Sequence, residues 1–282
     1  MVQGSIETQT AREILSEPGA PVIVFDHVRL AFDDKVVLED VSFTLIKGHT
    51  KIVLGASGSG KSTALKIVVG LLKADAGVVW VNGQRVDQLT EKALMTVRAD
   101  LGMIFQEGAL FDSLTVRENV GYKLYEETSL PLAEIDQRVE EVLGFIGLAE
   151  HIDKMPSELS GGQRRRVAIA RAMAFKPSIM LYDEATTGLD PITATTVDDE
   201  MLKLRDIENV SSIIVTHQLR DAFYVAEHMA IRKANGVHIV RATREKEREA
   251  EFIMLRDGFI IFEGDADALR SSTDPYIRSF LS

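Results

Sequence analysis

Alternating apolar and polar positions mark the first patterned part of the chain. Residues 22–32 and 36–48 alternate in this way and are rich in Val, Leu and Phe, which predicts two β-strands with one face toward solvent. Residues 77–86 carry Asn82-Gly83 between apolar positions, and this dipeptide favours the tight turn of a β-hairpin. We therefore expect an antiparallel β region near the N-terminus.

A second pattern follows, in which short apolar runs alternate with helical spacing. Residues 51–54, 177–185 and 210–218 contain continuous apolar runs, which are typical of strands buried on both faces. Residues 62–72 place their apolar side chains at helical spacing directly after the first of these runs. This alternation predicts a doubly wound α/β core around a parallel sheet.

Two further segments complete the expected fold. The helical period dominates from about residue 91 to residue 157, which predicts a helical insertion into the core. Residues 251–264 consist of two apolar runs separated by Arg256-Asp257-Gly258, which predicts a second hairpin near the C-terminus. We find no long internal repeat.

Composition and charge narrow the possible functions. The net charge of −11 repels nucleic-acid backbones, so we expect no nucleic-acid partner. The chain has no cysteine, which excludes disulfides, thiolate catalysis and cysteine-bound metals. No apolar run reaches the roughly 18 residues of a membrane-spanning helix. Residues 1–21 lack the pattern of a signal peptide and are expected to form a flexible arm.

The segment GASGSGKST at residues 55–63 fits the phosphate-loop pattern and lies between an expected strand and an expected helix. Its glycines let backbone N–H groups close around phosphate oxygens, where the helix N-terminus adds partial positive charge. Lys61 is expected to reach the β- and γ-phosphates of ATP, and Ser62 to bind Mg²⁺. The candidate nucleotide-binding residues here are Gly55, Ala56, Ser57, Gly58, Ser59, Gly60, Lys61, Ser62 and Thr63.

A carboxylate suited to the same metal ends the apolar run IMLYDE. Asp183 is expected at the carboxyl end of its strand, and ligands bind at that edge of a parallel sheet. Glu184 follows immediately and is placed to orient an attacking water as a general base. The alternative for both residues is a strand that simply ends in solvated acids.

The segment ELSGGQRRRVAIARAM at residues 158–173 sets two glycines beside three arginines. The glycines at the start of a helix suit an anion site. On a helix, Arg164, Arg165 and Arg166 point in three directions, so they cannot form one flat nucleic-acid patch. We expect most of these arginines to be solvated or paired within the chain.

Taken in order, these motifs resemble those of the ATP-binding cassette (ABC) ATPases over about residues 22–270. The matching segments are GASGSGKST, Phe105-Gln106, LSGGQ, IMLYDE, GLDP at residues 188–191 and Thr216-His217. The resemblance implies an ABC-type P-loop NTPase with a RecA-like core sheet and an N-terminal antiparallel β region. It also implies a helical subdomain at about residues 100–165 and leaves residues 271–282 as a C-terminal tail.

The resemblance also implies roles for residues outside the phosphate loop. Phe32 would stack on adenine unless it is a core residue, Gln106 would sense Mg²⁺ and the γ-phosphate, and His217 would contact the γ-phosphate. Asp190 would bridge two nucleotide sites across a homodimer. In that dimer, LSGGQ of one chain would face the ATP of the other, and the residues concerned are Ser160, Gly161, Gly162 and Gln163. The implied metal ligands are Ser62, Gln106 and Asp183.

Residues 102–122 and the closing residues 272–282 resemble more narrowly the ATPases of Mla-type and MCE-associated lipid transporters. This implies a subunit at the cytoplasmic face of the inner membrane, bound to permease subunits and MCE or other substrate-binding components. Leu110, Phe111 and Leu114 would then line the groove for the permease or belong to the core.

Two other functions stay open. The chain could energise an importer of amino acids or other polar solutes, or act as a soluble ABC ATPase without a transport role. The charged insertion at residues 233–251 is longer than the lipid-transport resemblance implies. Its mixed charges at residues 241–251 predict a solvated loop or helix, with a regulatory contact as the alternative.

Overall fold

The computed structural model describes residues 20–105 and 109–282. The expected N-terminal arm therefore lies almost wholly outside the described residues, and so does Gln106. Within the described ranges, no helix has both the length and the apolar character needed to cross a membrane.

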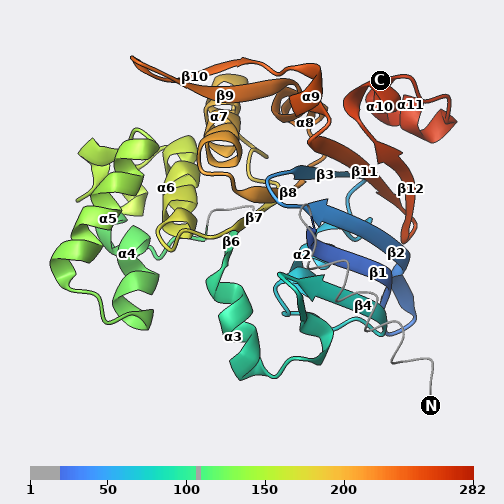
Figure 1. The fold of residues 1–282 in the computed structure, drawn as a ribbon, viewed down its shortest axis with the longest axis horizontal. Coiled ribbons are helices and arrows are strands. Elements are labelled where there is room, and N and C mark those ends of the chain that lie inside the picture. The colour runs from blue at the N-terminus through green and yellow to red at the C-terminus, as the bar shows by residue number, and fades with distance from the viewer. Residues whose placement is uncertain (1–19, 106–108) are drawn as a thin grey trace.

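One ten-stranded sheet organises the molecule, with a parallel part and an antiparallel part (Figure 1). The order across the sheet is β5-β4-β1-β2-β12-β11-β3-β8-β7-β6. The parallel part is β11-β3-β8-β7-β6. Strand β12 runs antiparallel to β11 and joins β2 of the antiparallel part through a single parallel pairing, Phe259 with Asp40. The strands are β1 (Pro21–Phe32), β2 (Lys35–Ile46), β3 (Thr50–Leu54), β4 (Ala76–Val81), β5 (Gln84–Arg85), β6 (Leu101–Ile104), β7 (Ile179–Asp183), β8 (Ser211–Val215), β11 (Ala250–Arg256) and β12 (Phe259–Gly264).

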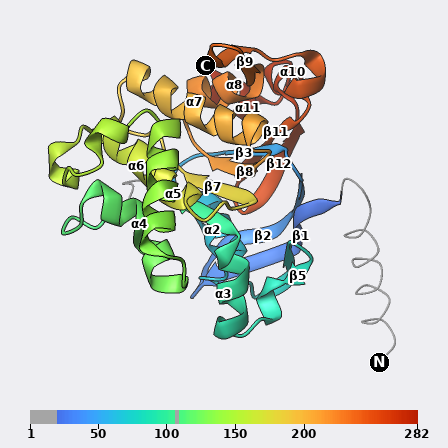
Figure 2. The same ribbon diagram turned by 60° about the vertical axis from the view of Figure 1, so that its left-hand side comes forward.

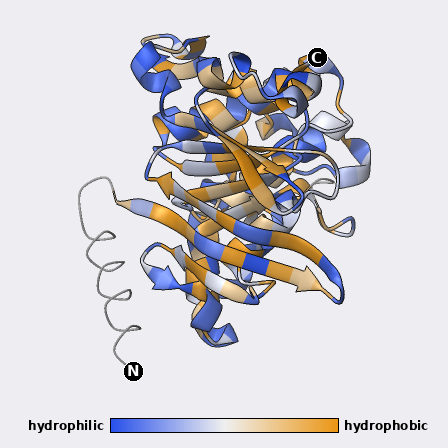
Figure 3. Cartoon of the chain, turned by 90° about the vertical axis from the view of Figure 1, so that its right-hand side faces the viewer, coloured by the Kyte–Doolittle hydropathy of each residue, from blue (hydrophilic) through white to orange (hydrophobic). Residues whose placement is uncertain are grey.

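The antiparallel part confirms the alternating pattern of the sequence. In β2, Leu38, Val41, Phe43 and Leu45 are buried, while the intervening Ser42 and Thr44 are exposed. Figure 3 shows hydrophobic and hydrophilic segments alternating along the long strands near the N-terminal end. The strands β4 and β5 form the expected hairpin, with both turn residues at positive φ.

Helices cover the parallel part and extend to one side of it (Figures 1 and 2). The α-helices are α2 (Lys61–Val68), α3 (Glu91–Ala99), α4 (Val116–Glu127), α5 (Leu132–Phe145), α6 (Gly161–Met173), α7 (Pro191–Ile207), α8 (Leu219–Glu227), α9 (Arg244–Glu247), α10 (Ala266–Arg270) and α11 (Pro275–Leu281). Short 3-10 turns occupy Val86–Gln88, Ala149–His151 and Pro156–Glu158. The α/β fold with an antiparallel β region and a helical region is confirmed.

The helical region does not have a core of its own. Val116 of α4 and Val139 of α5 share one hydrophobic cluster with Ile104 of β6 and Tyr182 of β7. The range expected to be helical, residues 100–165, begins with β6, which pairs in parallel with β7 at the edge of the sheet. This arrangement places the helical region directly against the strand that ends in Asp183.

A separate two-stranded sheet, β9 (His228–Lys233) and β10 (Gly236–Arg241), packs along α7 near the C-terminal part of the chain (Figure 1). Val237 and Ile239 are half-buried against the core cluster. The mixed-charge stretch that follows contains α9, which buries none of its residues completely, but its Lys246 pairs with buried Asp206 at 2.9 Å, so this helix is not wholly solvated. The hairpin itself was not predicted.

Candidate active site

The phosphate loop connects β3 to α2 and depends on glycine at two positions. Gly55 has φ +151°, and a methyl group there would lie 2.5 Å from the carbonyl oxygen of Leu255. Gly60 has φ +101°, and a methyl group there would lie 2.9 Å from the carbonyl oxygen of Val37. Any larger residue would therefore push the loop away from the strands that support it.

Lys61 lies inside this loop. Its Nζ donates to the carbonyl oxygens of Gly55 at 2.8 Å and Ala56 at 3.0 Å. Burial lowers the pKa of Lys61, and the nearby carboxylates of Glu184 and Asp183 act in the opposite direction. Two carbonyl oxygens thus hold the ammonium group. A phosphate oxygen, which carries more negative charge, would attract it more strongly.

The loop fits a phosphate ligand on two structural observations. The N-cap of α2, Gly60, has no side chain to accept from the first backbone N–H groups of the helix. The Oγ atom of Ser59 is buried and has no hydrogen-bond partner within the described residues. An anion at the start of α2 would satisfy such donors and gain from the helix dipole.

Ser62 and Asp183, the two residues expected to bind Mg²⁺ through their side chains, lie in contact. The Ser62 hydroxyl donates to Oδ1 of Asp183 at 2.7 Å. Burial raises the pKa of Asp183, and the hydrogen bond from Ser62 opposes that rise. The described residues contain no cluster of three or more His, Cys, Asp or Glu suited to a metal.

Glu184 is held by three contacts beside this pair. Its Oε2 lies 2.9 Å from Nδ1 of His217 and accepts a hydrogen bond from the Thr187 hydroxyl at 2.9 Å. Its backbone N–H donates to the carbonyl oxygen of Val215 at 2.9 Å. Glu184 also has φ +52°, an uncommon conformation for a residue with a side chain. The backbone therefore turns sharply where β7 ends.

The LSGGQ segment begins α6 and caps its own N-terminus. The Ser160 hydroxyl accepts from the N–H of Gln163 at 3.2 Å, and Oε1 of Gln163 accepts from the N–H of Ser160 at 2.8 Å. Nε2 of Gln163 also lies 2.7 Å from Nε2 of His151. Ser160 is exposed and Gly161 is half-exposed, so this helix start faces solvent in the single chain.

The GLDP segment lies directly beside LSGGQ. A methyl group at Gly162 would lie 2.0 Å from Cγ2 of Thr193, and one at Gly161 would lie 3.5 Å from Cδ2 of Leu189. Asp190 caps α7 by accepting from the N–H groups of Ile192 and Thr193, both at 3.1 Å. The structure thus joins the two motifs into one surface.

The three arginines of α6 donate to backbone carbonyl oxygens in different parts of the chain. Arg164 reaches Leu159, and Arg166 reaches Ile146. Arg165 donates to Phe105 at the end of β6 and to Thr187 in the turn after Glu184. The expectation of pairing within the chain is confirmed, and no common basic face results.

The remaining predicted residues lie apart from these contacts. Phe32 ends β1 and is 46% exposed, so it is not a core residue. Leu110 and Leu114 are half-buried, whereas Phe111 is 42% exposed and packs against Tyr122 with ring centroids 4.6 Å apart.

Thr187, whose hydroxyl donates to Glu184, was not predicted from the sequence. The signal that could have found it is its position three residues after Glu184.

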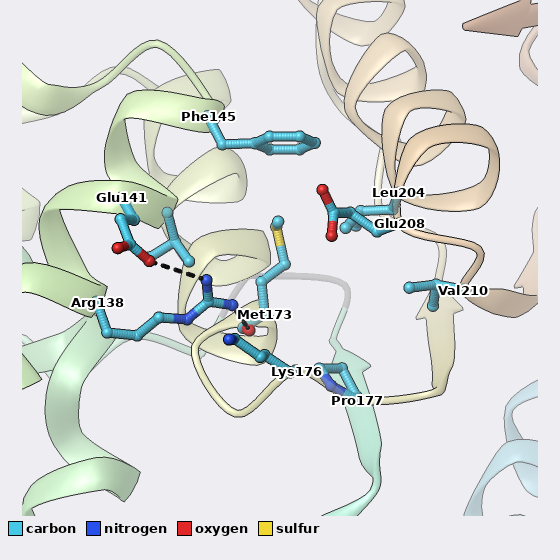
Figure 4. Close-up of a pocket in the computed structure, with 10 residues that line it drawn as sticks. Arg138, Glu141, Phe145, Met173, Lys176, Pro177, Leu204, Glu208 and Val210 are labelled. Atoms are coloured by element: carbon cyan, nitrogen blue, oxygen red, sulfur yellow. Dashed lines mark hydrogen bonds and ion pairs between the residues drawn. The ribbon is translucent and has the colours of Figure 1, made fainter. Parts of the chain in front are cut away.

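A cavity of about 370 Å³ lies at the opposite edge of the sheet (Figure 4). Pro177 lines it just before β7, and Val210 just before β8, so it opens at the amino ends of these strands. Figure 4 shows the ion pair of Arg138 with Glu141 along one wall. Since Asp183 is at the carboxyl end of β7, this cavity is separate from the phosphate loop.

Comparison with known proteins identifies the family. Residues 38–187 match the family described as ABC transporter, and these residues make up more than half of the chain. The chain belongs to the ABC transporter family. It is accordingly an ATPase that binds ATP with Mg²⁺.

Three relatives extend this comparison beyond the matched domain. The chloroplastic protein TRIGALACTOSYLDIACYLGLYCEROL 3 of Arabidopsis thaliana is 36% identical over 267 residues, covering 89% of this chain and 70% of its own. The Escherichia coli K12 intermembrane phospholipid transport ATP-binding protein MlaF is 32% identical, covering 88% and 84%. The methionine import ATP-binding protein MetN of Bifidobacterium longum is 38% identical over 77% of this chain, which spans only 56% of MetN.

Solved structures agree on the fold. The chain superimposes on CbiO1 of Clostridium perfringens with a TM-score of 0.75 at 23% identity, covering 93% of this chain and 95% of the other. It superimposes on the ATP-binding cassette MJ0796, in a dimeric post-hydrolysis state bound to ADP and Pi, with a TM-score of 0.69 at 28% identity. That match covers 86% of this chain and 98% of the cassette.

Proposed function

We propose that the chain hydrolyses ATP as a homodimer and so drives a membrane permease that moves phospholipid or a related lipid. The observation that carries the lipid assignment is the extent of the similarity. MlaF, named for intermembrane phospholipid transport, aligns with 88% of this chain, whereas the MetN proteins align with 74–78%. The resemblance of residues 102–122 to the lipid-transport ATPases supports the same assignment.

In the proposed reaction, five residues of one chain form the catalytic half-site. Lys61 and the loop N–H groups hold the β- and γ-phosphates, and Ser62 with Asp183 would hold Mg²⁺, which neutralises phosphate charge when bound. Glu184 accepts a proton from the attacking water, and His217 orients Glu184 and contacts the γ-phosphate. The existing contacts among these side chains support this assignment, since they already hold Glu184 and Asp183 beside the phosphate loop.

The second chain supplies the other half-site through its LSGGQ and GLDP surface. Helix N-termini bind anions, and Ser160, Gly161 and Asp190 are all accessible from solvent. Ile192 is 83% exposed beside Asp190, so a dimer that used the GLDP surface would also cover this side chain. A head-to-tail dimer would cover both features and complete two ATP sites related by two-fold symmetry.

The permease contact is proposed near the segment that follows β6. Phe111 and Tyr122 form an exposed aromatic pair, and aromatic residues are enriched at the cores of protein interfaces. Asn119, fully buried, binds the N–H and carbonyl groups of Phe111 and so fixes this loop. The chain would dock there at the cytoplasmic face of the inner membrane, in a complex that also contains an MCE-type or other substrate-binding component.

Purification of the tagged chain from native membranes tests this assignment, with every associated protein and lipid identified by mass spectrometry. We expect a permease and bound phospholipid, enriched relative to a mock purification from the same membranes. Recovery of a permease that binds methionine and retains no lipid would contradict the lipid assignment. It would favour the second candidate, which the 38–40% identity to MetN proteins supports. A complex free of membrane proteins would favour a soluble ATPase.

A further inference from the structure

Two buried aspartates lie where α7 packs against α8. The side chain of Asp198 on α7 is 2% exposed, and that of Asp221 on α8 is 6% exposed. Oδ2 of Asp198 accepts no hydrogen bond within the described residues. Two buried acids side by side are costly unless a proton or a cation compensates them.

Arg220 is the cation that faces this pair. Its Nε donates to Oδ1 of Asp221 at 2.7 Å, its Nη2 pairs with the same oxygen, and Nη2 lies 4.0 Å from Oδ2 of Asp198. Its Nη1 donates to the carbonyl oxygen of Pro191 at 2.8 Å. One guanidinium group therefore joins the start of α8 to the start of α7.

The two ends of this connection are close in sequence to proposed active-site residues. Pro191 directly follows Asp190, the residue at the exposed GLDP surface. Arg220 comes three residues after His217, which contacts Glu184. A shift of Arg220 would thus change the relation between the GLDP segment and His217 without touching Lys61, Ser62 or Asp183.

We propose that Arg220 is a positioning residue that keeps Asp190 and His217 in the relative positions needed for ATP hydrolysis. The charge of Asp198 sets how strongly Arg220 binds Pro191. This inference rests on the proposed roles of His217 and Asp190. Arg220 contacts none of the residues assigned to the phosphates, so it acts through its neighbours. Its loss should lower the rate of hydrolysis rather than the affinity for ATP.

The charge of Asp198 decides how strongly its carboxylate competes with the carbonyl oxygen of Pro191 for Arg220. Burial, followed by the charge of Asp221, raises the pKa of Asp198 to about 8, and Arg220 opposes the rise. The other charged group facing Asp198 is Asp199, which accepts a hydrogen bond from the Tyr224 hydroxyl at 2.8 Å. Below this pKa Asp198 is neutral, and Arg220 donates its hydrogen bonds to Asp221 and Pro191. Above it, the new carboxylate attracts Nη2 and weakens the bond to Pro191.

The test measures kcat and KM for ATP from pH 6.5 to 9.5 in the full-length chain within its membrane complex. We expect Arg220→Gln to lower kcat about tenfold with KM for ATP changed less than about twofold, and Arg220→Lys to restore part of the loss. In the wild type, kcat should fall as pH rises through about 8, and Asp198→Asn, close in shape to the protonated acid, should remove that fall.

Arg232→Gln is the matched control, because Arg232 is an exposed cation at the end of β9 and loses the same charge. Equal kcat values and equal pH profiles for Arg220→Gln, Arg232→Gln and wild type would overturn the inference. An Asp198→Asn variant that keeps the alkaline fall would overturn the role of Asp198. The proposed active site itself fails separately, if Glu184→Gln or His217→Ala retains full turnover.

Discussion

Helix α2 begins after Gly60 and helix α6 begins after Ser160, so the chain has two glycine-rich helix starts with opposite local chemistry. At α2 no side chain caps the helix, and Lys61 is buried beside Asp183 and Glu184. At α6 the Ser160 and Gln163 side chains satisfy the first donors. The first start is prepared for a ligand within its own chain, whereas at the second the side chains of Ser160 and Gln163 cap each other's backbone N–H groups.

This difference explains why one chain is insufficient under the proposed mechanism. Within the described ranges, no hydrogen bond or ion pair joins residues 160–163 to residues 55–63. The LSGGQ start is capped and exposed, and Gly162 lies against Thr193, whose hydroxyl donates to Asp190 at 2.5 Å. A capped, exposed helix N-terminus can still attract an anion brought by another molecule. We therefore predict that the N-termini of α2 and α6 meet only between two chains.

The largest expected effect comes from mixing two defective chains. Lys61→Ala removes the phosphate cation, and Ser160→Arg places a bulky side chain over the other start, so each alone should lose about a hundredfold or more in turnover. A one-to-one mixture forms mixed dimers with one intact composite site each. Turnover per total protein should therefore rise clearly above that of either variant, up to about a quarter of the wild-type rate, if dimers form at random.

The readout is steady-state phosphate release from mixtures of the two variants at several ratios. The control is each variant alone at the same total protein concentration. A mixture that stays as inactive as its components, although mixed dimers form, would show that the two helix starts do not share a site. Full wild-type turnover would equally contradict the mechanism.

Local sequence patterns predicted most of the fold because the corresponding elements are long or carry strong turn signals. The hairpin β9–β10 was not predicted although Asn235-Gly236 separates its two strands; most residues of these strands are half-buried or exposed, so their apolar pattern is weak. The strand β6 has four residues, too few to show a period, and its partner β7 lies about 75 residues later. Pairing at such distance is set by tertiary contacts.

The candidate active-site residues can be named from the sequence where one motif contains the whole proposed chemistry, as in the phosphate loop. Contacts between motifs were not predicted. The bond from Thr187 to Glu184 and the packing of Gly162 on Thr193 depend on how α6, α7 and β7 meet. The Arg220 cluster is a further example, since Asp198 and Arg220 are distant in sequence and their patterns are those of ordinary surface residues.

Alanine at the two signature glycines, Gly161 and Gly162, should have an intermediate effect. Gly162→Ala would place a methyl group 2.0 Å from Thr193 and should cost about 1–3 kcal/mol of unfolding free energy. Gly161→Ala meets only Leu189 at 3.5 Å, an ordinary contact, and should leave stability nearly unchanged while lowering turnover. Denaturant unfolding and phosphate release measure the two effects separately.

Thr193→Ser in the Gly162→Ala background provides the control. It removes the clashing methyl group and keeps the Thr193 hydroxyl position, which donates to Asp190 at 2.5 Å. We expect it to recover most of the lost stability. Equal destabilisation by the two alanines would show that the close packing of α6 on α7 is not what distinguishes the glycines.

Removing the Ser160 hydroxyl should have the smallest effect and decides what this side chain does. As an N-cap, its loss in Ser160→Ala should cost about 1 kcal/mol of unfolding free energy, measured by denaturant titration. Thr115→Ala is the matched control, because Thr115 forms the same kind of capping box with Glu118 at the start of α4. If Ser160 only caps α6, both variants should lose similar stability and keep similar turnover at low ATP. If it also faces the phosphate of a second chain, only Ser160→Ala should slow hydrolysis, because only that cap belongs to the exposed helix start beside Asp190.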